Sequence, residues 1–189
     1  MTGWTTSFGA GGYDMFLVKT DTSGTVLWSK TFGGTGNDFG TRVRQTSDGG
    51  FAISGYTDSF GTGSNDMYLV RTDAGGNLIW SETIGNALGE LAFDLQIVSG
   101  GYVLSGYSYL TSTDRDAVLI KTDTNGSIQW AMQYGDSLDE NALSVKQLDS
   151  GGYIIGAYAT SFAWNPHIYL IKTDSAGASG CNESAISLA

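Results

Sequence analysis

The residues that could carry chemistry are few, and most of them recur along the chain. Two acidic series and one basic series repeat at similar spacing: Asp14, Asp66 and Asp116; Asp38, Glu90 and Glu140; and Lys19, Arg71, Lys121 and Lys172. A ring of alternating charges could hold an ion or a charged ligand in a central channel. We favour the alternative that these residues form repeated ion pairs or capped turns between structural units.

Catalytic groups are scarce. The single histidine, His167, beside Pro166, would have to serve any Ser/His/Asp triad, and a lone loop histidine is more often incidental. Acids for glycoside hydrolysis should be non-repeated, a criterion that Asp58, Asp114 and Asp136 meet only loosely. Calcium needs several converging oxygens, and no Asp-x-Asp-x-Asp loop occurs. We therefore predict that the chain is not an enzyme and binds no metal or cofactor.

Composition excludes several function classes. The net charge is −10, and the nine Lys and Arg residues are spread evenly, so no basic patch is available for nucleic acid or an anionic membrane. The one cysteine, Cys181, allows no intrachain disulfide. No apolar run approaches the roughly 18 residues of a membrane helix, and the N-terminus lacks the basic and apolar regions of a signal peptide.

A repeat of about 51 residues organises the chain, within the range of propeller blades. Its clearest motif reads KTDTSGTVLW (19–28), RTDAGGNLIW (71–80) and KTDTNGSIQW (121–130), and a fourth copy begins as KTDSAG (172–177). Asp should cap a turn, Gly should supply a positive φ, and Trp should pack between units. These structural residues are Asp21, Gly24, Trp28, Asp73, Gly76, Trp80, Asp123, Gly126 and Trp130.

Each repeat contains four expected strands. In the first copy they are strand a (14–21), strand b (25–32), strand c (roughly 41–47) and strand d (51–57). Strand d also carries a recurring pair, Gly55-Tyr56, Gly106-Tyr107 and Ala157-Tyr158, which we interpret as scaffold. Four strands joined by hairpins, with both faces apolar, predict an all-β β-propeller of four-stranded antiparallel blades, about 3.5 in this chain. Tandem β-sandwich domains are the structural alternative.

A family resemblance supports this fold. The segment WSKTFGGTGNDFGTRVRQTSDGGFAISGYTDSF (28–60) resembles the bacterial β-propeller repeat of the SBBP type, and the resemblance covers almost the whole chain. It implies an extracellular or cell-surface location, often within a large multi-domain bacterial protein. The tail SAGASGCNESA (175–185) resembles the exit from such arrays. The resemblance is specific for fold and uninformative about activity.

The predicted ring does not close. We divide the chain into one array, 1–177, and a C-terminal tail, 178–189. The array comprises a partial blade at 1–13, repeats at 14–65, 66–115 and 116–166, and a partial blade at 167–177. The tail is too short and polar to supply the missing strands b and c. We expect either a homodimer that completes a ring of about seven blades, or neighbouring blades in a longer chain.

Function should lie where the copies differ. The d-to-a connections vary most (5–13, 58–65, 109–115 and 160–166), and they should share one face with the b-to-c loops. The candidate ligand-binding residues there are Phe8, Tyr13, Phe60, Tyr109, Asp114, Arg115, Phe162 and Trp164. Aromatic rings with polar neighbours suit glycan or protein ligands; alternatively, they cover blade edges. We predict a non-catalytic extracellular or cell-surface binding or adhesion module. The alternatives are a structural spacer of a larger secreted protein, and a glycan-active hydrolase or lyase.

Overall fold

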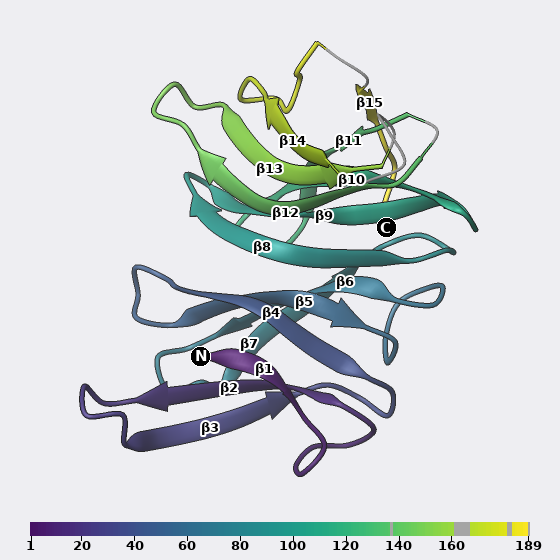
Figure 1. The fold of residues 1–189 in the computed structure, drawn as a ribbon. Helices are drawn as coiled ribbons and strands as arrows, with labels where there is room; N and C mark the ends of the chain where they lie inside the picture. Colours follow the sequence, from purple (N-terminus) through teal and green to yellow (C-terminus); the bar gives the residue numbers. More distant parts are fainter. Residues whose placement is uncertain (137, 161–166, 181–182, 189) are drawn as a thin grey trace.

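The chain folds into four antiparallel β-sheets that follow one another along the sequence (Figure 1). The computed structural model describes residues 1–136, 138–160, 167–180 and 183–188. The described part contains strands and turns, and it has no helix long and apolar enough to cross a membrane. The all-β, antiparallel prediction is therefore confirmed.

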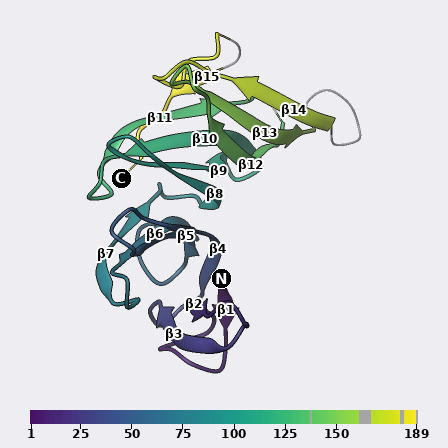
Figure 2. The ribbon, with the colours of Figure 1, turned by 90° about the vertical axis from the view of Figure 1, so that its left-hand side faces the viewer.

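The sheets are stacked in chain order (Figure 2). The first contains β1 (Thr2–Thr5), β2 (Asp14–Thr20) and β3 (Val26–Phe32). The second contains β4 (Asp38–Gln45), β5 (Phe51–Thr57), β6 (Asp66–Thr72) and β7 (Leu78–Ile84). The third contains β8 (Glu90–Val98), β9 (Gly101–Thr111), β10 (Asp114–Thr122), β11 (Ile128–Tyr134) and β15 (Glu183–Ala185). The fourth contains β12 (Glu140–Gln147), β13 (Tyr153–Ala159) and β14 (His167–Lys172).

The sheets begin half a repeat later than the predicted a-b-c-d unit. The second sheet has the order β4-β5-β6-β7, which is c-d-a-b, and strand c starts at Asp38 rather than near 41. Strand b and the following strand c are not hydrogen-bonded neighbours, because they belong to different sheets. In β3, for example, Val26 and Leu27 are 60% and 57% exposed, whereas β4 is largely covered. The b-to-c connection therefore carries the chain from one sheet to the next.

The predicted Asp-x-x-Gly turns join strands a and b. Asp73 Oδ1 accepts hydrogen bonds from the backbone N–H groups of Gly75 and Asn77, each at 2.8 Å. Gly76 then takes φ +77°, a left-handed conformation that side-chain-bearing residues rarely adopt. The copies at Asp21, Asp123 and Asp174 accept equivalent bonds. Both predicted roles of this motif are confirmed.

The core consists of apolar layers between successive sheets. Met67 and Leu69 of β6 face Ala92 and Leu95 of β8, and all four are fully buried. Strand a is therefore buried on both faces in β6, which explains its nearly continuous apolar sequence. Burying a side chain of this size contributes about 1.5–3 kcal/mol, so the stacking of sheets is the main source of stability.

The repeated tryptophans lock each sheet onto the next one. Trp80 of β7 lies edge-on to Tyr102 of the third sheet, with ring centroids 5.9 Å apart. A side chain at Gly126, in the following Asp-x-x-Gly turn, would overlap the Trp80 indole. Trp28 and Trp130 have the same relation to the next sheets. The tryptophans thus pack between sheets, as the sequence predicted.

The C-terminal tail covers an outer edge instead of completing the fourth sheet. Its strand β15 pairs with β11 of the third sheet, and the Ile186 N–H donates to the Ala131 carbonyl at 3.1 Å. Ile186 and Leu188 pack against the core between the second and third sheets. Strand β14 consequently remains the last strand of its three-stranded sheet.

Candidate functional site

The d-to-a and b-to-c connections meet at one end of the sheets, as predicted. Their backbones are hydrogen-bonded to each other: Gly12 N to Gly36 O at 2.9 Å, Ser64 N to Leu88 O at 3.2 Å, and Tyr109 N to Gly89 O at 3.0 Å. Because these bonds link one sheet's d-to-a segment with a neighbouring b-to-c segment, the connections form a continuous surface.

Near this end, a band of aromatic side chains crosses all four sheets. Its members are Trp4, Tyr13, Phe39, Tyr56, Phe93, Tyr107, Tyr109 and Tyr158, and we call it the aromatic strip. Four of them occupy one repeated position of strand d, once in each of β1, β5, β9 and β13.

The strip begins between the first and second sheets. Phe39 of β4 lies at its centre: the Trp4 ring is 5.5 Å away edge-on, the Tyr13 ring is 5.3 Å away, and the Tyr56 ring stacks on it at 4.7 Å. Trp4 remains 57% exposed and Tyr13 41% exposed. This part of the strip therefore presents large apolar rings to solvent.

The strip continues over the third sheet. The Tyr107 ring is 5.7 Å from Phe93 and 5.5 Å from Tyr109. Burial raises the pKa of Tyr107, and the neighbouring phenols of Tyr109 and Tyr56 raise it further. Strand β5, which carries Tyr56, contacts strand β8, which carries Phe93, so the two halves of the strip lie on neighbouring strands.

Arg115 of β10 anchors the far half of the strip. Its guanidinium lies 4.8 Å from the Tyr107 ring and 5.9 Å from the Tyr109 ring, and Nη2 is 3.1 Å from Asp139 Oδ2. Burial disfavours the charge on Arg115, but Asp139, Tyr109 and Tyr158 outweigh burial and raise its pKa. Arg115 thus stays charged and already has partners on both sides.

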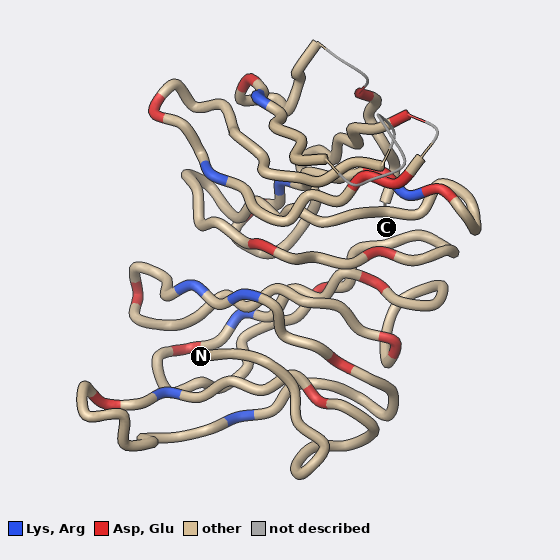
Figure 3. Tube along the Cα trace, in the orientation of Figure 1, with Lys and Arg blue, Asp and Glu red and all other residues tan. Residues whose placement is uncertain are grey.

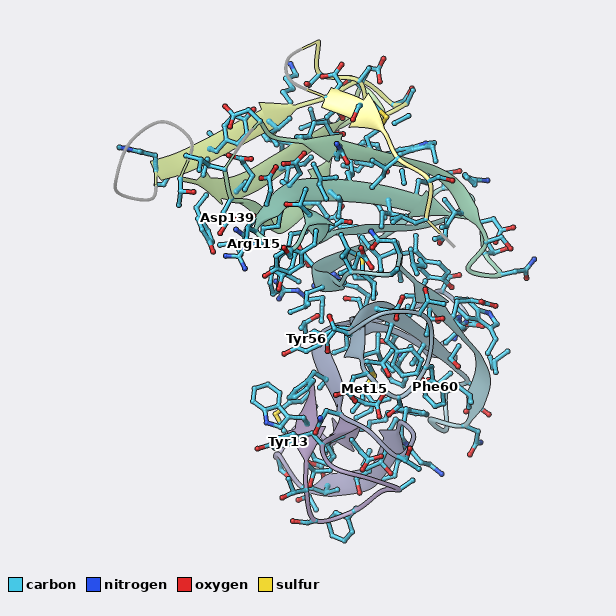
Figure 4. The ribbon with its side chains drawn as sticks, turned by 90° about the vertical axis from the view of Figure 1, so that its right-hand side faces the viewer. Tyr13, Met15, Tyr56, Phe60, Arg115 and Asp139 are labelled. Atoms are coloured by element: carbon cyan, nitrogen blue, oxygen red, sulfur yellow. The ribbon has the colours of Figure 1, made fainter. Side chains whose placement is uncertain are left out.

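Figure 4 shows Tyr13, Tyr56, Arg115 and Asp139 along one side of the molecule, with Phe60 toward the other. The Phe60 ring instead packs 5.7 Å from Tyr68.

The structure unites only part of the predicted ligand-binding set. Tyr13 and Tyr109 belong to the strip, Arg115 lies against it, and Asp114 precedes Arg115 in β10. Phe8 is 71% exposed, outside the ring contacts that define the strip. Phe162 and Trp164 lie outside the described residues.

The predicted loop at 109–115 is wrong. Strand β9 runs to Thr111 and β10 starts at Asp114, so Tyr109, Asp114 and Arg115 are strand residues. This copy lacks the glycine-rich insertion of 58–65, and a turn at 112–113 lets the hairpin continue.

Sequence reasoning missed the strip because it looked for variable residues. Tyr56, Tyr107 and Tyr158 recur with the scaffold motif and were interpreted as scaffold. Trp4 holds the same position in the first sheet, since both Trp4 and Tyr56 pair with the methionine that follows the first acid of strand a. The signal in the sequence that could have revealed the strip is an aromatic residue that recurs at one position of strand d in every copy.

The two acidic series form buried pairs where one sheet meets the next. In each pair, an acid near the start of strand a faces the first residue of the following strand c: Asp14 with Asp38, Asp66 with Glu90, and Asp116 with Glu140. All six are at most 3% exposed. A side chain on Gly33, Gly85 or Gly135 would overlap both carboxyl groups of its pair, so these glycines open the slot in which the carboxyls meet.

The third pair lacks a hydrogen bond that the others have. Asp38 accepts from the Thr57 hydroxyl at 2.5 Å, and Glu90 accepts from the Ser108 hydroxyl at 2.8 Å. The residue opposite Glu140 is Ala159, which has no hydroxyl. Glu140 Oε1 and Asp116 Oδ1 therefore have no hydrogen-bond partner among the described residues.

The third pair, which lacks this hydrogen bond, has raised pKa values. Burial raises the pKa of Glu140 to about 7 and that of Asp116 to about 6, with repulsion from nearby carboxylates adding to both. Two such groups in one slot share a proton more readily than they both ionise.

The ring of alternating charges, which we considered from the sequence but did not favour, does not form among the described residues. The acids start strand a and the bases end it, as with Asp14 and Lys19 in β2, so they lie at opposite ends of the sheets (Figure 3). Arg71 pairs with Asp48 at 2.5 Å, and the Lys19 ammonium lies 5.9 Å from the Trp28 ring. The acids cap turns instead, as Asp38 does by accepting from the Gly34 N–H at 2.9 Å. No cluster of three potential metal-ligating side chains occurs in the described ranges.

Comparison with known proteins gives no match, either to a protein-family model or to a curated protein.

Proposed function

We propose that the chain is a non-catalytic extracellular or cell-surface binding module that holds its ligand along the aromatic strip. The observation that carries the proposal is the recurrence of a ring at one position of strand d in four successive sheets. Trp4 and Tyr13 leave much of their area exposed. Contiguous exposed apolar surface of this kind is typical of interaction sites, and aromatic residues dominate binding energy.

A propeller scaffold is part of the proposal. Strands c of neighbouring sheets lie side by side: Arg42 Nε is 2.7 Å from Asp94 Oδ1, and the Val145 N–H donates to Asp94 Oδ2 at 3.1 Å. Thr41 Oγ1 also donates to the Ala92 carbonyl at 2.8 Å. Inner strands that contact one another in sequence are what radial stacking about an axis requires. The resemblance to SBBP-type repeats supports the same scaffold and an extracellular location.

We also propose a partner that covers the exposed face of β14 in the fourth sheet. Ile168 and Leu170 of β14 are 89% and 66% exposed, whereas their counterparts Met67 and Leu69 in β6 are fully buried by the next sheet. A homodimer completing a ring, or neighbouring blades of a longer chain, would cover this face.

Ligand screening with matched variants tests the proposal. Purified protein is screened against glycan and protein arrays, and each hit is repeated with Trp4→Ala, Tyr13→Ala and Phe8→Ala. We expect the first two to weaken binding and the third, an exposed ring outside the strip, to leave it unchanged. Loss of binding with Phe8→Ala alone would assign the ligand to a loop instead. A protein that binds nothing would be a spacer.

The hydrolase or lyase alternative has the least support. Among the described residues, the closely paired carboxyls that recur are buried; Asp116 and Glu140, for example, are 2% and 1% exposed. A general acid must be placed toward its substrate, whereas the two carboxyl groups of each pair face each other where one sheet meets the next.

A further inference from the structure

The spacing of the aromatic strip constrains the shape of its ligand. Trp4, Tyr56, Tyr107 and Tyr158 come from four sheets in succession, and packed sheets are about 10 Å apart. A compact ligand would reach one or two of these rings. Tyr107 is only 8% exposed, whereas Trp4 is exposed and Tyr56 and Tyr158 are partly exposed. A ligand that uses Trp4, Tyr56 and Tyr158 together must be extended and must offer apolar surfaces repeatedly along its length.

From this geometry we propose, building on the binding function above, that the ligand is an uncharged polysaccharide lying across the sheets. A sugar ring has an apolar C–H face that stacks on an aromatic ring and a rim of hydroxyl groups. Tyrosine suits both features, since it combines an apolar body with a phenol that donates and accepts hydrogen bonds. Three of the four repeated rings are tyrosines.

One end of the strip adds a hydrogen-bonding group. Asn141 of β12 pairs directly with Tyr158 and therefore shares its face of the sheet. Asn141 is 2% exposed, and its Nδ2 has no hydrogen-bond partner among the described residues. The equivalent positions hold Phe39 and Leu91. A buried amide that costs stability in the free protein gains a partner when a hydroxyl acceptor reaches it.

Charge favours a neutral chain over an acidic one. The cation on the strip, Arg115, is already bound to Asp139 and stacked on Tyr107. Asp114 adjoins it in sequence, and the whole chain carries a net charge of −10. Uronic acid or sulfated polymers would approach a negative surface on which Arg115 is already paired with a carboxylate.

The test compares polymers and chain lengths. Affinity electrophoresis measures binding to hydroxyethyl cellulose, xylan and dextran, with alginate and polygalacturonate as anionic counterparts. We expect retardation by at least one neutral polymer, and oligosaccharides from that polymer should bind more tightly as they lengthen. Trp4→Ala and Tyr56→Ala should each weaken binding by about fivefold or more. Phe60→Ala, on the other side of the molecule, is the matched control.

Asn141→Leu provides a variant that should fold well. It places at this position the residue that β8 has at 91, and it removes an unpaired buried amide. We expect unchanged or higher thermal stability together with weaker polysaccharide binding. A purely structural role for Asn141 would leave binding unchanged, and that result would remove it from the site.

The outcomes separate the two proposals. Binding to anionic polymers or peptides alone, with loss in Trp4→Ala, would overturn the neutral polysaccharide and leave the strip as the binding site. Polysaccharide binding that is insensitive to every strip variant would overturn the strip itself. Absence of binding to the entire neutral panel would overturn the polysaccharide proposal outright.

Discussion

Restoring one hydroxyl opposite Glu140 should stabilise the protein at neutral pH. In the second and third sheets, Thr57 and Ser108 donate to the acid that begins strand c, and Ala159 is the corresponding residue in the fourth. Ala159→Ser would add a donor within reach of the unpaired Glu140 Oε1. The neighbouring sheet accommodates a serine at this position, so we expect little steric cost.

The magnitude follows from the pKa of Glu140. Its rise from 4.5 to about 7 corresponds to about 3.5 kcal/mol at most, at about 1.4 kcal/mol per unit. A hydrogen bond to a charged group contributes about 1.5–3 kcal/mol. Water near the connections weakens the effect, so we expect a gain in unfolding free energy of about 1–2 kcal/mol at pH 8.

The gain should depend on pH in a defined direction. The folded-state pKa values of Asp116 and Glu140 lie above their ordinary values of 3.8 and 4.5. The folded protein therefore binds more protons than the unfolded chain between about pH 4 and pH 7, and stability falls as the pH rises through this window. Asp66 and Glu90, whose pKa values are also raised by burial, contribute the same sign in both proteins. Ala159→Ser should flatten the fall by holding Glu140 ionised.

Urea unfolding followed by tryptophan fluorescence, from pH 5 to pH 8.5, measures this effect. Glu140→Gln supplies the control in a double-mutant cycle, because the added serine then has no carboxylate to bond. Equal gains from Ala159→Ser with and without Glu140 would refute the reasoning, as would a gain that is larger at pH 5 than at pH 8.

Other substitutions probe the scaffold. Gly126→Ala should lower the free energy of unfolding, measured in urea, by about 3 kcal/mol. The φ of Gly126 is +88°, and the added methyl group would overlap Trp80. Gly24→Ala, with φ +87° and open space around it, should cost only about 1–2 kcal/mol, and equal losses would argue against the tryptophan contact. Deleting residues 183–189 should lower stability by about 2 kcal/mol through loss of the Ile186 and Leu188 packing, and an unchanged midpoint would contradict this. Leu170→Lys should reduce any self-association seen by light scattering, unless another surface mediates it.

Much of the scaffold could be read from the sequence because its signals are local. Asp73 and Gly76 specify a turn by themselves, and the strand limits at 51–57 match the structure. The grouping of strands could not be read in the same way. Whether strand b pairs with the following c depends on which edge each occupies, and that depends on contacts between sheets, such as Arg42 with Asp94.

The site was predicted in part for a related reason. Tyr13, Tyr109 and Arg115 stood out as non-repeated residues, whereas Tyr56 and Tyr107 were hidden by their regular recurrence. A search for residues that differ between copies passes over a residue that recurs in every copy. A binding surface made of one residue from each copy is regular by construction, and only the stacking of sheets brings its members together.

The pairing of β15 with β11 has a mechanical consequence. Three residue pairs join them among the described residues, and Tyr134 reinforces the attachment by donating its hydroxyl to the Gly177 carbonyl at 2.6 Å. Tension on the C-terminus would first peel β15 away, one pair at a time, and draw Ile186 and Leu188 out of the core. The sheets themselves would bear load only afterwards. The tail thus acts as a weak link that yields under force before the stacked sheets are strained.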